Sequence, residues 1–156
     1  MNRRQFTLQA LAAGAGLSLA GTRALAQGAG TEGREYTVLK EPVAVASSGK
    51  VEVIEFFGYW CPHCAAFEPT LDAWARKLPT DVNFRRIPVA FSPAQEIYQR
   101  LYFALEALGA VNAVHGKVFT AIHQNHQRLD KEADIAALAQ ANGVDGAKLL
   151  DAMKSF

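Results

Sequence analysis

Residues 53–64 read Val-Ile-Glu-Phe-Phe-Gly-Tyr-Trp-Cys-Pro-His-Cys and hold the only two cysteines of the 156-residue chain, Cys61 and Cys64. Strand-forming residues occupy positions 51–57, just before these thiols. After Cys64, apolar residues recur at helical spacing, at Phe67, Leu71, Trp74 and Leu78. The pattern predicts that the two thiols lie where a strand ends and a helix begins.

This position has a chemical consequence for Cys61. Pro62 suits the first position of a helix, where its missing N–H costs nothing, and this places Cys61 at the N-cap. There the thiol faces free backbone N–H groups and the positive end of the helix dipole. We therefore expect the pKa of Cys61 to fall below the free value of about 8.5, with the His63 ring as a further donor. A stabilised thiolate favours the reduced dithiol, which makes the disulfide form an oxidant.

Three other interpretations of the cysteine pair fit the sequence less well. A disulfide that closes a four-residue loop would stabilise the fold by only about 2 kcal/mol. A structural zinc site takes four ligands, and the chain has no second cysteine pair. Inert core thiols do not suit the mouth of a strand–helix turn. Motif and context therefore favour a redox pair, for which we expect neither a metal nor another cofactor.

The composition limits the classes of function. Half of the residues are apolar and a fifth are charged, as in ordinary soluble globular proteins. Without residues 1–26, which hold three arginines and no acidic residue, the net charge falls from +1 to −2, so no basic character favours nucleic-acid binding. No stretch after residue 26 has the length and apolarity of a membrane span, and the length fits one domain.

Residues 1–26 have the features of an export signal. Paired arginines lie near the start, residues 8–20 are apolar, and residues 24–26, Ala-Leu-Ala, form a small-x-small cleavage site. Both the twin-arginine and the general secretion route fit this segment. Either route would place the mature protein in the bacterial periplasm, where disulfides persist. Residues 27–35, which are rich in glycine, are expected to form a flexible leader.

Residues 36–92 are expected to form an α/β core. Residues 36–39 and 82–91 have the patterns of strands, and Pro88 suggests that the ladder of the second is interrupted there. Residues 51–57, apolar on both sides apart from two glutamates, have that of a central strand covered on both faces. The helix after Cys64 is expected to end at residues 79–81, Pro-Thr-Asp.

Glu55 shares one face of the predicted strand with Val51, Val53 and Phe57. If it is buried, desolvation would raise its pKa, and it could pass protons to or from Cys64. The alternative is a carboxylate that reaches solvent at the sheet end. Because its neighbours on that face are apolar, we favour the buried position.

Residues 93–156 are expected to form a helical subdomain. Apolar residues recur at helical spacing in four stretches, which begin near Ile97, Val111, Ile135 and Leu149. Three aromatic residues of the first stretch are expected to line the core or a groove: Tyr98, Tyr102 and Phe103. Three histidines lack the further ligands of a metal set and are expected on the surface: His115, His123 and His126.

With these residues in place, the chain resembles a known family. Trp-Cys-Pro-His-Cys at 60–64 after a Val/Ile/Phe strand, with Pro69 five residues beyond the second cysteine, resembles the thioredoxin superfamily. Cys-Pro-His-Cys after Glu-Phe-Phe, followed by a helical insertion, is similar to the DsbA family of periplasmic thiol oxidases. The likeness runs from Tyr36 to the end of the chain. It implies that Cys61 forms the mixed disulfide with substrate, that Cys64 is its buried partner, and that Pro62 and His63 tune the potential.

The resemblance also implies secondary site residues and partners. Glu55 would be the buried acid beneath the active site and Glu68 an acid early in the active-site helix, while Trp60 is a further candidate. The substrates would be reduced exported proteins, and re-oxidation would come from a DsbB-like, quinone-linked membrane protein. We expect a monomer.

The sequence departs from the pattern of the family at its end. The superfamily has a later cis-proline beside the disulfide, two further strands and a last helix, but no proline follows Pro93. We therefore expect a thioredoxin-like α/β fold with an inserted helical subdomain, cut short before its final strands and helix. The expected function is an enzyme, a thiol:disulfide oxidoreductase that donates its disulfide to exported proteins. The alternatives are a disulfide isomerase, a periplasmic thiol reductant, or an inactive truncated remnant.

Overall fold

A computed structural model describes residues 30–41, 43–44 and 49–156. The expected export signal lies outside the described residues, and so does the start of the expected leader. The chain divides into two units, residues 1–43 and 44–156. In the first unit Gly33 N–H donates to Tyr36 O over 2.7 Å and closes a turn. The strand expected at residues 36–39 is wrong, because among the described residues Tyr36 forms only an isolated bridge with Glu32, and residues 37–39 form neither helix nor strand.

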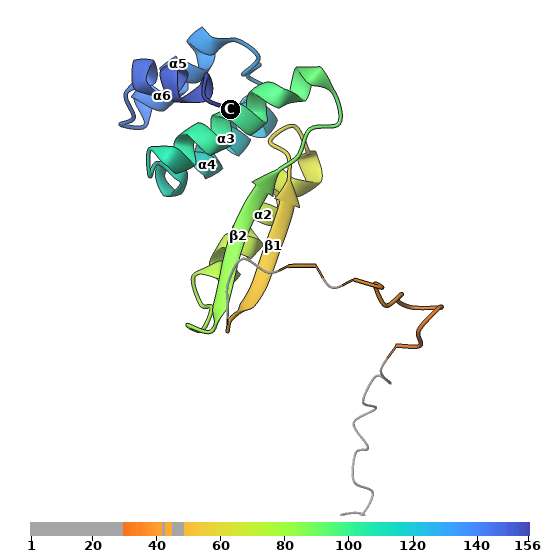
Figure 1. The fold of residues 1–156 in the computed structure, drawn as a ribbon. Helices are drawn as coiled ribbons and strands as arrows, with labels where there is room; N and C mark the ends of the chain where they lie inside the picture. The colour runs from red at the N-terminus through yellow and green to blue at the C-terminus, as the bar shows by residue number, and fades with distance from the viewer. Residues whose placement is uncertain (1–29, 42, 45–48) are drawn as a thin grey trace, which may run out of the picture. The chain divides into compact units, whose positions relative to one another are not determined.

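The second unit begins with a β–α–β arrangement. It consists of β1 (Val51–Phe57), α2 (Pro62–Ala75) and β2 (Val82–Pro88). The two strands are parallel, in a register that runs from Val51 opposite Val82 to Phe57 opposite Pro88. Parallel neighbours need a crossover, and α2 provides it along one face of the strand pair (Figure 1).

Helix α2 ends earlier than the sequence suggested, and β2 ends at Pro88, where the sequence predicted that the ladder is interrupted. Lys77 N–H donates to Trp74 O and Leu78 N–H to Ala75 O, so the last turn tightens and α2 stops at Ala75. Strand β2 stops at Pro88, because proline has no N–H to donate to the ladder. One further bond follows, from Val89 N–H to Phe57 O over 2.7 Å.

The two faces of β1 are covered unequally at its carboxyl end. Phe57 is 1% exposed, whereas its neighbour Phe56, which points to the other face, is 65% exposed. The expectation of a central strand covered on both faces is therefore wrong for this structure. The physical reason is that the described sheet has two strands, so β1 has a strand neighbour on one side, and α2 lies along one face of the pair (Figure 1).

Four helices follow the strands, as the apolar spacing predicted. A short 3-10 turn, η1 (Pro93–Gln95), leads into α3 (Glu96–Ala107), α4 (Val111–Phe119) with the π-helical turn η2 (Thr120–Gln124), α5 (Glu132–Ala141) and α6 (Gly146–Met153). Gly109 and Gly143 follow α3 and α5 with φ of +65° and +80°, a conformation that favours glycine at a helix end. In the described residues, no helix has the length and apolar character needed to cross a membrane.

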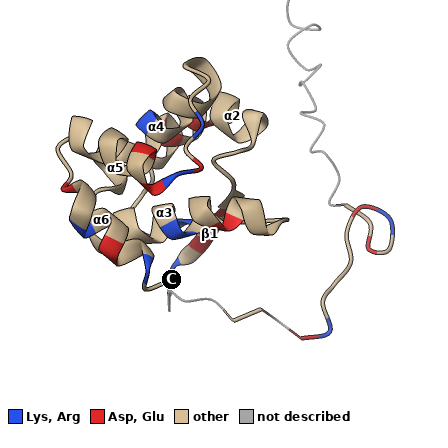
Figure 2. Ribbon diagram, turned by 90° about the horizontal axis from the view of Figure 1, so that it is seen from above, with Lys and Arg blue, Asp and Glu red and all other residues tan. Residues whose placement is uncertain are grey.

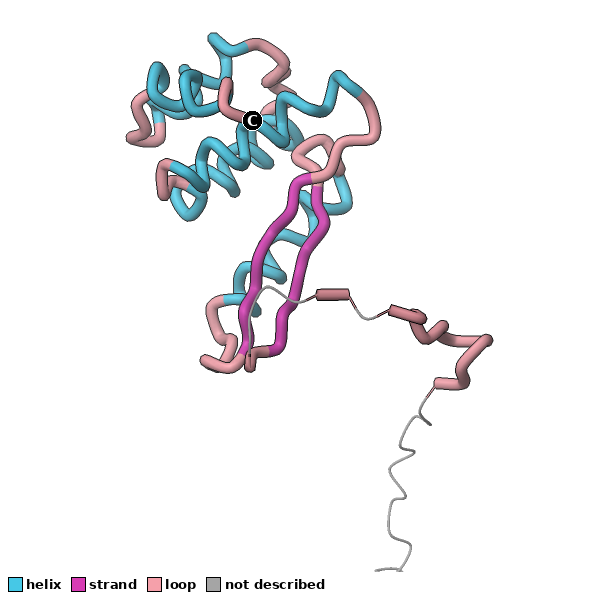
Figure 3. Tube along the Cα trace, viewed as in Figure 1, coloured by secondary structure: helices cyan, strands magenta, loops and turns pink. Residues whose placement is uncertain are grey.

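The buried core joins the end of β1 to these helices, which gather beyond the carboxyl ends of the strands (Figures 1 and 3). Phe57 and Tyr59, at 1% and 0% exposure, belong to the same cluster as Leu101, Leu105 and Val118. Of the three aromatic residues expected in core or groove positions, Tyr102 is buried, and Tyr98 and Phe103 pack partly buried against the core. Basic and acidic residues are interspersed along the helices (Figure 2).

Candidate active site

Cys61 is the N-cap of α2, as the sequence predicted. Its backbone is extended, with φ −86° and ψ 116°, and Pro62 takes the first helical position. The backbone N–H of Cys64 donates to Cys61 Sγ over 3.4 Å. The sulfur therefore satisfies one of the free N–H groups of the helix end, as a capping side chain does.

The two cysteines differ in acidity. Burial alone raises the pKa of Cys61, but hydrogen bonds from the Cys64 backbone, the Cys64 thiol and the His63 backbone outweigh it and lower the pKa below 9.0. The pKa of Cys64 is raised, first by burial and then by its bond to Cys61 and by the charges of Cys61 and Glu55. In this structure the Cys61 thiol therefore loses its proton more readily, and a Cys64 thiolate takes up a proton more readily.

His63 acts on Cys61 through its main chain. It is its backbone N–H that helps to lower the pKa of Cys61, whereas the His63 side chain is exposed. Pro62, between them, is exposed too. The effect of the His63 ring and of Pro62 on the redox potential stays a prediction.

Trp60 lies over Gly58 at the entrance to the site. Its Nε1–H donates to Val89 O over 3.4 Å, which ties the loop to the end of β2. Its ring meets the ring of Phe91 edge-on at 5.3 Å, and Phe91 is 79% exposed. An alanine Cβ at Gly58 would lie 2.5 Å from Trp60 Nε1, so only glycine leaves room for the indole.

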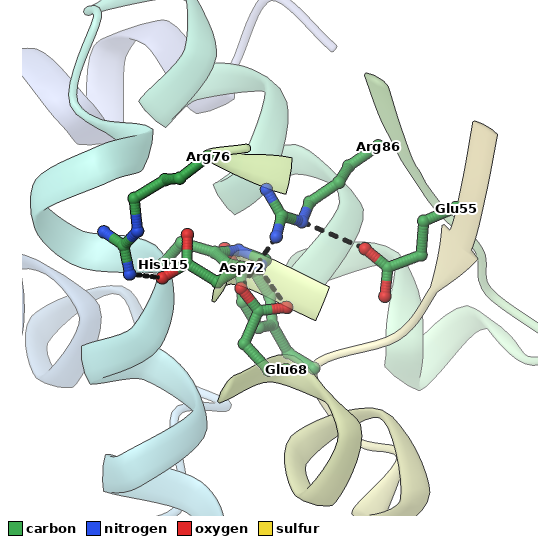
Figure 4. A network of polar contacts seen from close by, with 7 residues as sticks. Glu55, Glu68, Asp72, Arg76, Arg86 and His115 are labelled. Carbon is green, nitrogen blue, oxygen red and sulfur yellow. Dashed lines mark hydrogen bonds and ion pairs between the residues drawn. The ribbon is translucent and has the colours of Figure 1, made fainter. Parts of the chain in front are cut away.

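A network of polar contacts joins charged side chains of the strands and of α2 (Figure 4). Arg86 of β2 bonds two carboxylates, Glu55 Oε2 through Nε at 2.9 Å and Glu68 Oε1 through Nη2 at 2.8 Å. All three side chains are close to 12% exposed. The second oxygen of Glu68 lies 3.3 Å from Nε2 of His115 in α4. The network thus connects β1, α2, β2 and α4.

The two carboxyl groups respond in opposite directions. Burial raises the pKa of Glu55 above 4.5, and the charge of Arg86 offsets this only in part. Burial acts on Glu68 too, but His115 and Arg86 together lower its pKa below 4.5. The Glu55 side chain is thus largely buried and its pKa is raised, as the sequence predicted, whereas the neighbours of Glu68 favour its anion.

From the sequence, two residues of this arrangement were missed, Arg86 and Tyr59, and one, His115, was placed wrongly. Arg86 shares its strand face with Phe84, and its guanidinium lies 5.0 Å from the centre of that ring. The alternation of side chains along the strand was the signal in the sequence that could have found it. His115 was expected on the surface, and this was wrong, because it is 4% exposed. It lies four residues after Val111 and three before Val118, on the apolar face of α4, which was its signal.

Tyr59 is the third such residue, and it is wholly buried. Its hydroxyl lies 2.8 Å from Nδ1 of His115, and its carbonyl oxygen lies 2.7 Å from Nε2 of His123 in η2. His123 is therefore partly buried rather than on the surface, while His126 is exposed as expected. Two histidines of the helical part thus contact the residue two positions before Cys61.

A cavity of about 530 Å³ opens between α2 and the α4–η2 segment. Its polar lining comes from both sides and includes Glu68, Asp72, Arg76, Arg86, His115 and His123. Asp72 and Arg76 pair with one another. Within the described part of the chain, no three His, Cys, Asp or Glu side chains are grouped as metal ligands.

Comparisons with known proteins agree with this geometry. The Thioredoxin family matches residues 39–97. The thiol:disulfide interchange protein DsbA of Pseudomonas aeruginosa is 43% identical over 126 residues, which cover 81% of this chain and 60% of the relative. DsbA of Azotobacter vinelandii is 41% identical over 155 residues, which cover 98% of this chain and 72% of the relative. The chain thus spans between 60% and 72% of the length of these two relatives.

Solved structures give the same fold. The crystal structure of Pseudomonas aeruginosa DsbA superposes with a TM-score of 0.70 at 42% identity, covering 76% of this chain and 62% of that one. The crystal structure of the oxidoreductase DsbA from Xylella fastidiosa gives 0.63 at 33% identity, with 68% and 58% covered. The thioredoxin-like α/β fold expected from the sequence is confirmed. With a cysteine pair at the start of α2 and such identity along most of its length, the chain belongs to the DsbA family of thiol:disulfide oxidoreductases.

Proposed function

We propose that this chain is a thiol:disulfide oxidoreductase that donates the Cys61–Cys64 disulfide to reduced proteins. The observation that carries the proposal is the hydrogen-bonded position of Cys61 Sγ at the N-terminus of α2. A thiolate held by backbone N–H groups is a good leaving group and a stable product. Reduction of the disulfide therefore produces a stabilised thiolate, and this makes the disulfide an oxidant of other thiols.

The exchange takes two steps. A substrate thiolate attacks Cys61 Sγ, the Cys61–Cys64 bond breaks, and Cys64 leaves as a thiolate that takes up a proton. A second substrate thiolate then attacks the substrate sulfur of the mixed disulfide and expels Cys61 as its stabilised thiolate. The substrate loses two electrons and gains a disulfide, and the enzyme gains the two electrons as a dithiol.

Glu55 supplies the proton for Cys64 in this scheme. Burial raises the pKa of Glu55, which favours its protonated form, and its ionised form would raise the pKa of Cys64. A carboxyl group of this kind suits general acid and base work. Arg86, which also binds Glu68, holds Glu55 in place. Trp60 with the exposed Phe91 offers the substrate chain an aromatic surface next to Cys61.

The cellular setting follows from the family and from residues 1–26. We infer export through that segment to the periplasm, where reduced exported proteins are the substrates. A DsbB-like membrane protein would restore the disulfide. The protein would work as a monomer.

The direct test is disulfide transfer to a peptide with two cysteines. The full chain, oxidised beforehand with glutathione disulfide, is mixed with the reduced peptide, and peptide disulfide is measured by mass spectrometry against time. We expect one disulfide transferred per chain, no transfer from Cys61→Ser, and a trapped mixed disulfide through Cys61 in Cys64→Ser. The equilibrium with glutathione then gives the potential. A potential well below that of glutathione would replace the oxidant function with that of a reductant or isomerase.

A further inference from the structure

Two buried carboxylates share one guanidinium in this protein. Arg86 binds Glu55 on one side and Glu68 on the other, and each of the three side chains is only 11% or 12% exposed. One positive charge cannot neutralise two carboxylates, and like charges at close range favour a proton on one of them. The arrangement therefore holds a proton more readily than an ordinary ion pair does, and something must decide which carboxyl group takes it.

His115 makes the two carboxylates unequal. Its Nε2 lies 3.3 Å from Glu68 Oε2, and its side chain is 5% exposed. Both atoms are buried without an aligned hydrogen-bond partner among the described residues, and they lie within ion-pair distance of one another. Glu55 has Arg86 as its partner in the network and lies in β1, away from this contact. Glu68 therefore has two groups that favour its anion, and Glu55 has one.

Tyr59 fixes the ring of His115. A carboxylate only accepts hydrogen bonds, so the hydrogen of a neutral His115 ring belongs on Nε2, which faces Glu68. Nδ1 then accepts from the Tyr59 hydroxyl over 2.8 Å. Tyr59 itself is wholly buried, and His123 Nε2–H donates to its carbonyl oxygen over 2.7 Å. The tyrosine is thus held at both ends, which fixes the orientation of the imidazole between Glu68 and Tyr59.

We propose that His115 is a positioning residue that, oriented by Tyr59, keeps Glu68 as the anion of this network and leaves Glu55 to carry the proton. The proposal rests on the proposed role of Glu55 as proton donor to Cys64, and it explains why Glu55 rather than Glu68 carries the proton. The lowered pKa of Glu68 and the raised pKa of Glu55 agree with this division. In general, two carboxyl groups whose surroundings push their pKa values apart have separate acid and base roles.

The other charged groups around His115 do not replace it in this role. The described elements that line its cavity or pack against it contribute these titratable or charged side chains: Asp72 and Arg76 of α2, Arg86 of β2, Tyr102 of α3, and His123 of η2. Asp72 and Arg76 pair with one another, so their charges compensate. His123 is engaged with the Tyr59 carbonyl. His115 is thus the ring that distinguishes Glu68 from Glu55.

The test is a titration of the two carboxyl groups by carbon-13 NMR on the oxidised full chain, in which the cysteines do not titrate. In His115→Phe, whose ring suits the aromatic contacts of this site, we expect the Glu68 midpoint to rise by about one pH unit or more, and the Glu55 midpoint to fall. His115→Gln, which keeps an N–H toward Glu68, is expected to restore part of the difference. The exposed His126→Asn is the matched control, since asparagine tolerates the φ of +53° there.

A second variant guards against loss of folding. In Tyr59→Phe/His115→Phe both partners of the buried hydrogen bond are removed, so no hydroxyl is left unpaired. Unchanged midpoints of Glu55 and Glu68 in either variant would overturn the proposal, and so would equal midpoints in the unaltered chain. The titration needs no substrate. Failure of disulfide transfer with the expected midpoints would therefore refute the proposed function and leave the role of His115 standing.

Discussion

The backbone N–H of Cys64 donates to the sulfur of Cys61 over 3.4 Å, across the first turn of α2. The bond lowers the pKa of Cys61, whereas burial, followed by the thiol contact with Cys61 and its charge, raises the pKa of Cys64. The asymmetry of the pair thus has a local, geometric origin. It makes the order of the two exchange steps predictable.

Single-thiol variants should separate the two pKa values. We expect the thiolate absorbance of Cys64→Ser, which reports Cys61, to develop below pH 9.0, and that of Cys61→Ser, which reports Cys64, to develop above it. Absorbance at 240 nm against pH measures both, with the double serine variant as the blank. Coincident midpoints would mean that the cap hydrogen bond does not control reactivity.

The stability of the protein should depend on pH through Glu55 and Glu68 with opposite signs. Glu68 has a lowered folded pKa, so its contribution is complete above pH 4.5 and is lost as the pH falls through the folded value. Glu55 has a raised folded pKa, so its contribution is present below pH 4.5 and is lost as the pH rises through the folded value.

Urea unfolding of Glu55→Gln and Glu68→Gln between pH 3 and pH 7 checks this expectation. Relative to the unaltered chain, Glu68→Gln should lose less stability in acid, and Glu55→Gln should lose less stability as the pH rises above 4.5. Slopes of the same sign for both variants would show that the two carboxyl groups are equivalent.

Arg86 should be among the most costly polar residues to replace. Arg86→Gln leaves two buried carboxylates without their cation, which we expect to cost about 3–5 kcal/mol of unfolding free energy. Arg128→Gln is the control, because Arg128 pairs with Asp130 at the surface, with 87% of its side chain exposed, and exposed pairs contribute about 0–1 kcal/mol. Chemical denaturation at neutral pH gives both values. A loss below 1 kcal/mol for Arg86→Gln would mean that one of the carboxyl groups takes up a proton and relieves the repulsion.

Gly58 should be intolerant of a methyl group for a steric reason. In Gly58→Ala the new Cβ would meet the Trp60 indole at 2.5 Å, so the ring must leave Val89 O, with an expected cost of about 1–3 kcal/mol. Trp60 fluorescence in a Trp74→Phe background reports the movement. Gly116→Ala is the matched control, because its Cβ would meet nothing within 4 Å and alanine favours a helix by about 0.5–1 kcal/mol. Unchanged emission and stability in Gly58→Ala would show that the loop adapts without moving the indole.

The sequence by itself determined the features that depend on neighbours along the chain. Cys61 caps α2 because Pro62 follows it, and the apolar spacing after residue 93 located all four helices. These features follow from capping, backbone restriction and amphipathic periodicity, which act within one or two helical turns. The same reasoning placed Glu55 among apolar neighbours on one strand face.

The tertiary structure alone decided which distant side chains meet. Arg86 reaches Glu55 because β1 and β2 pair in the register that sets these two residues opposite one another, 31 positions apart. His115 reaches Tyr59 across 56 positions because α4 packs on the end of β1. Tertiary structure likewise decided that residues 37–39 form no strand with the described part of the chain and that Phe56 is exposed. A residue's type and spacing set what it can bond, but strand register and helix packing set which partner comes within a few ångström, and hydrogen bonds and ion pairs form only at that range.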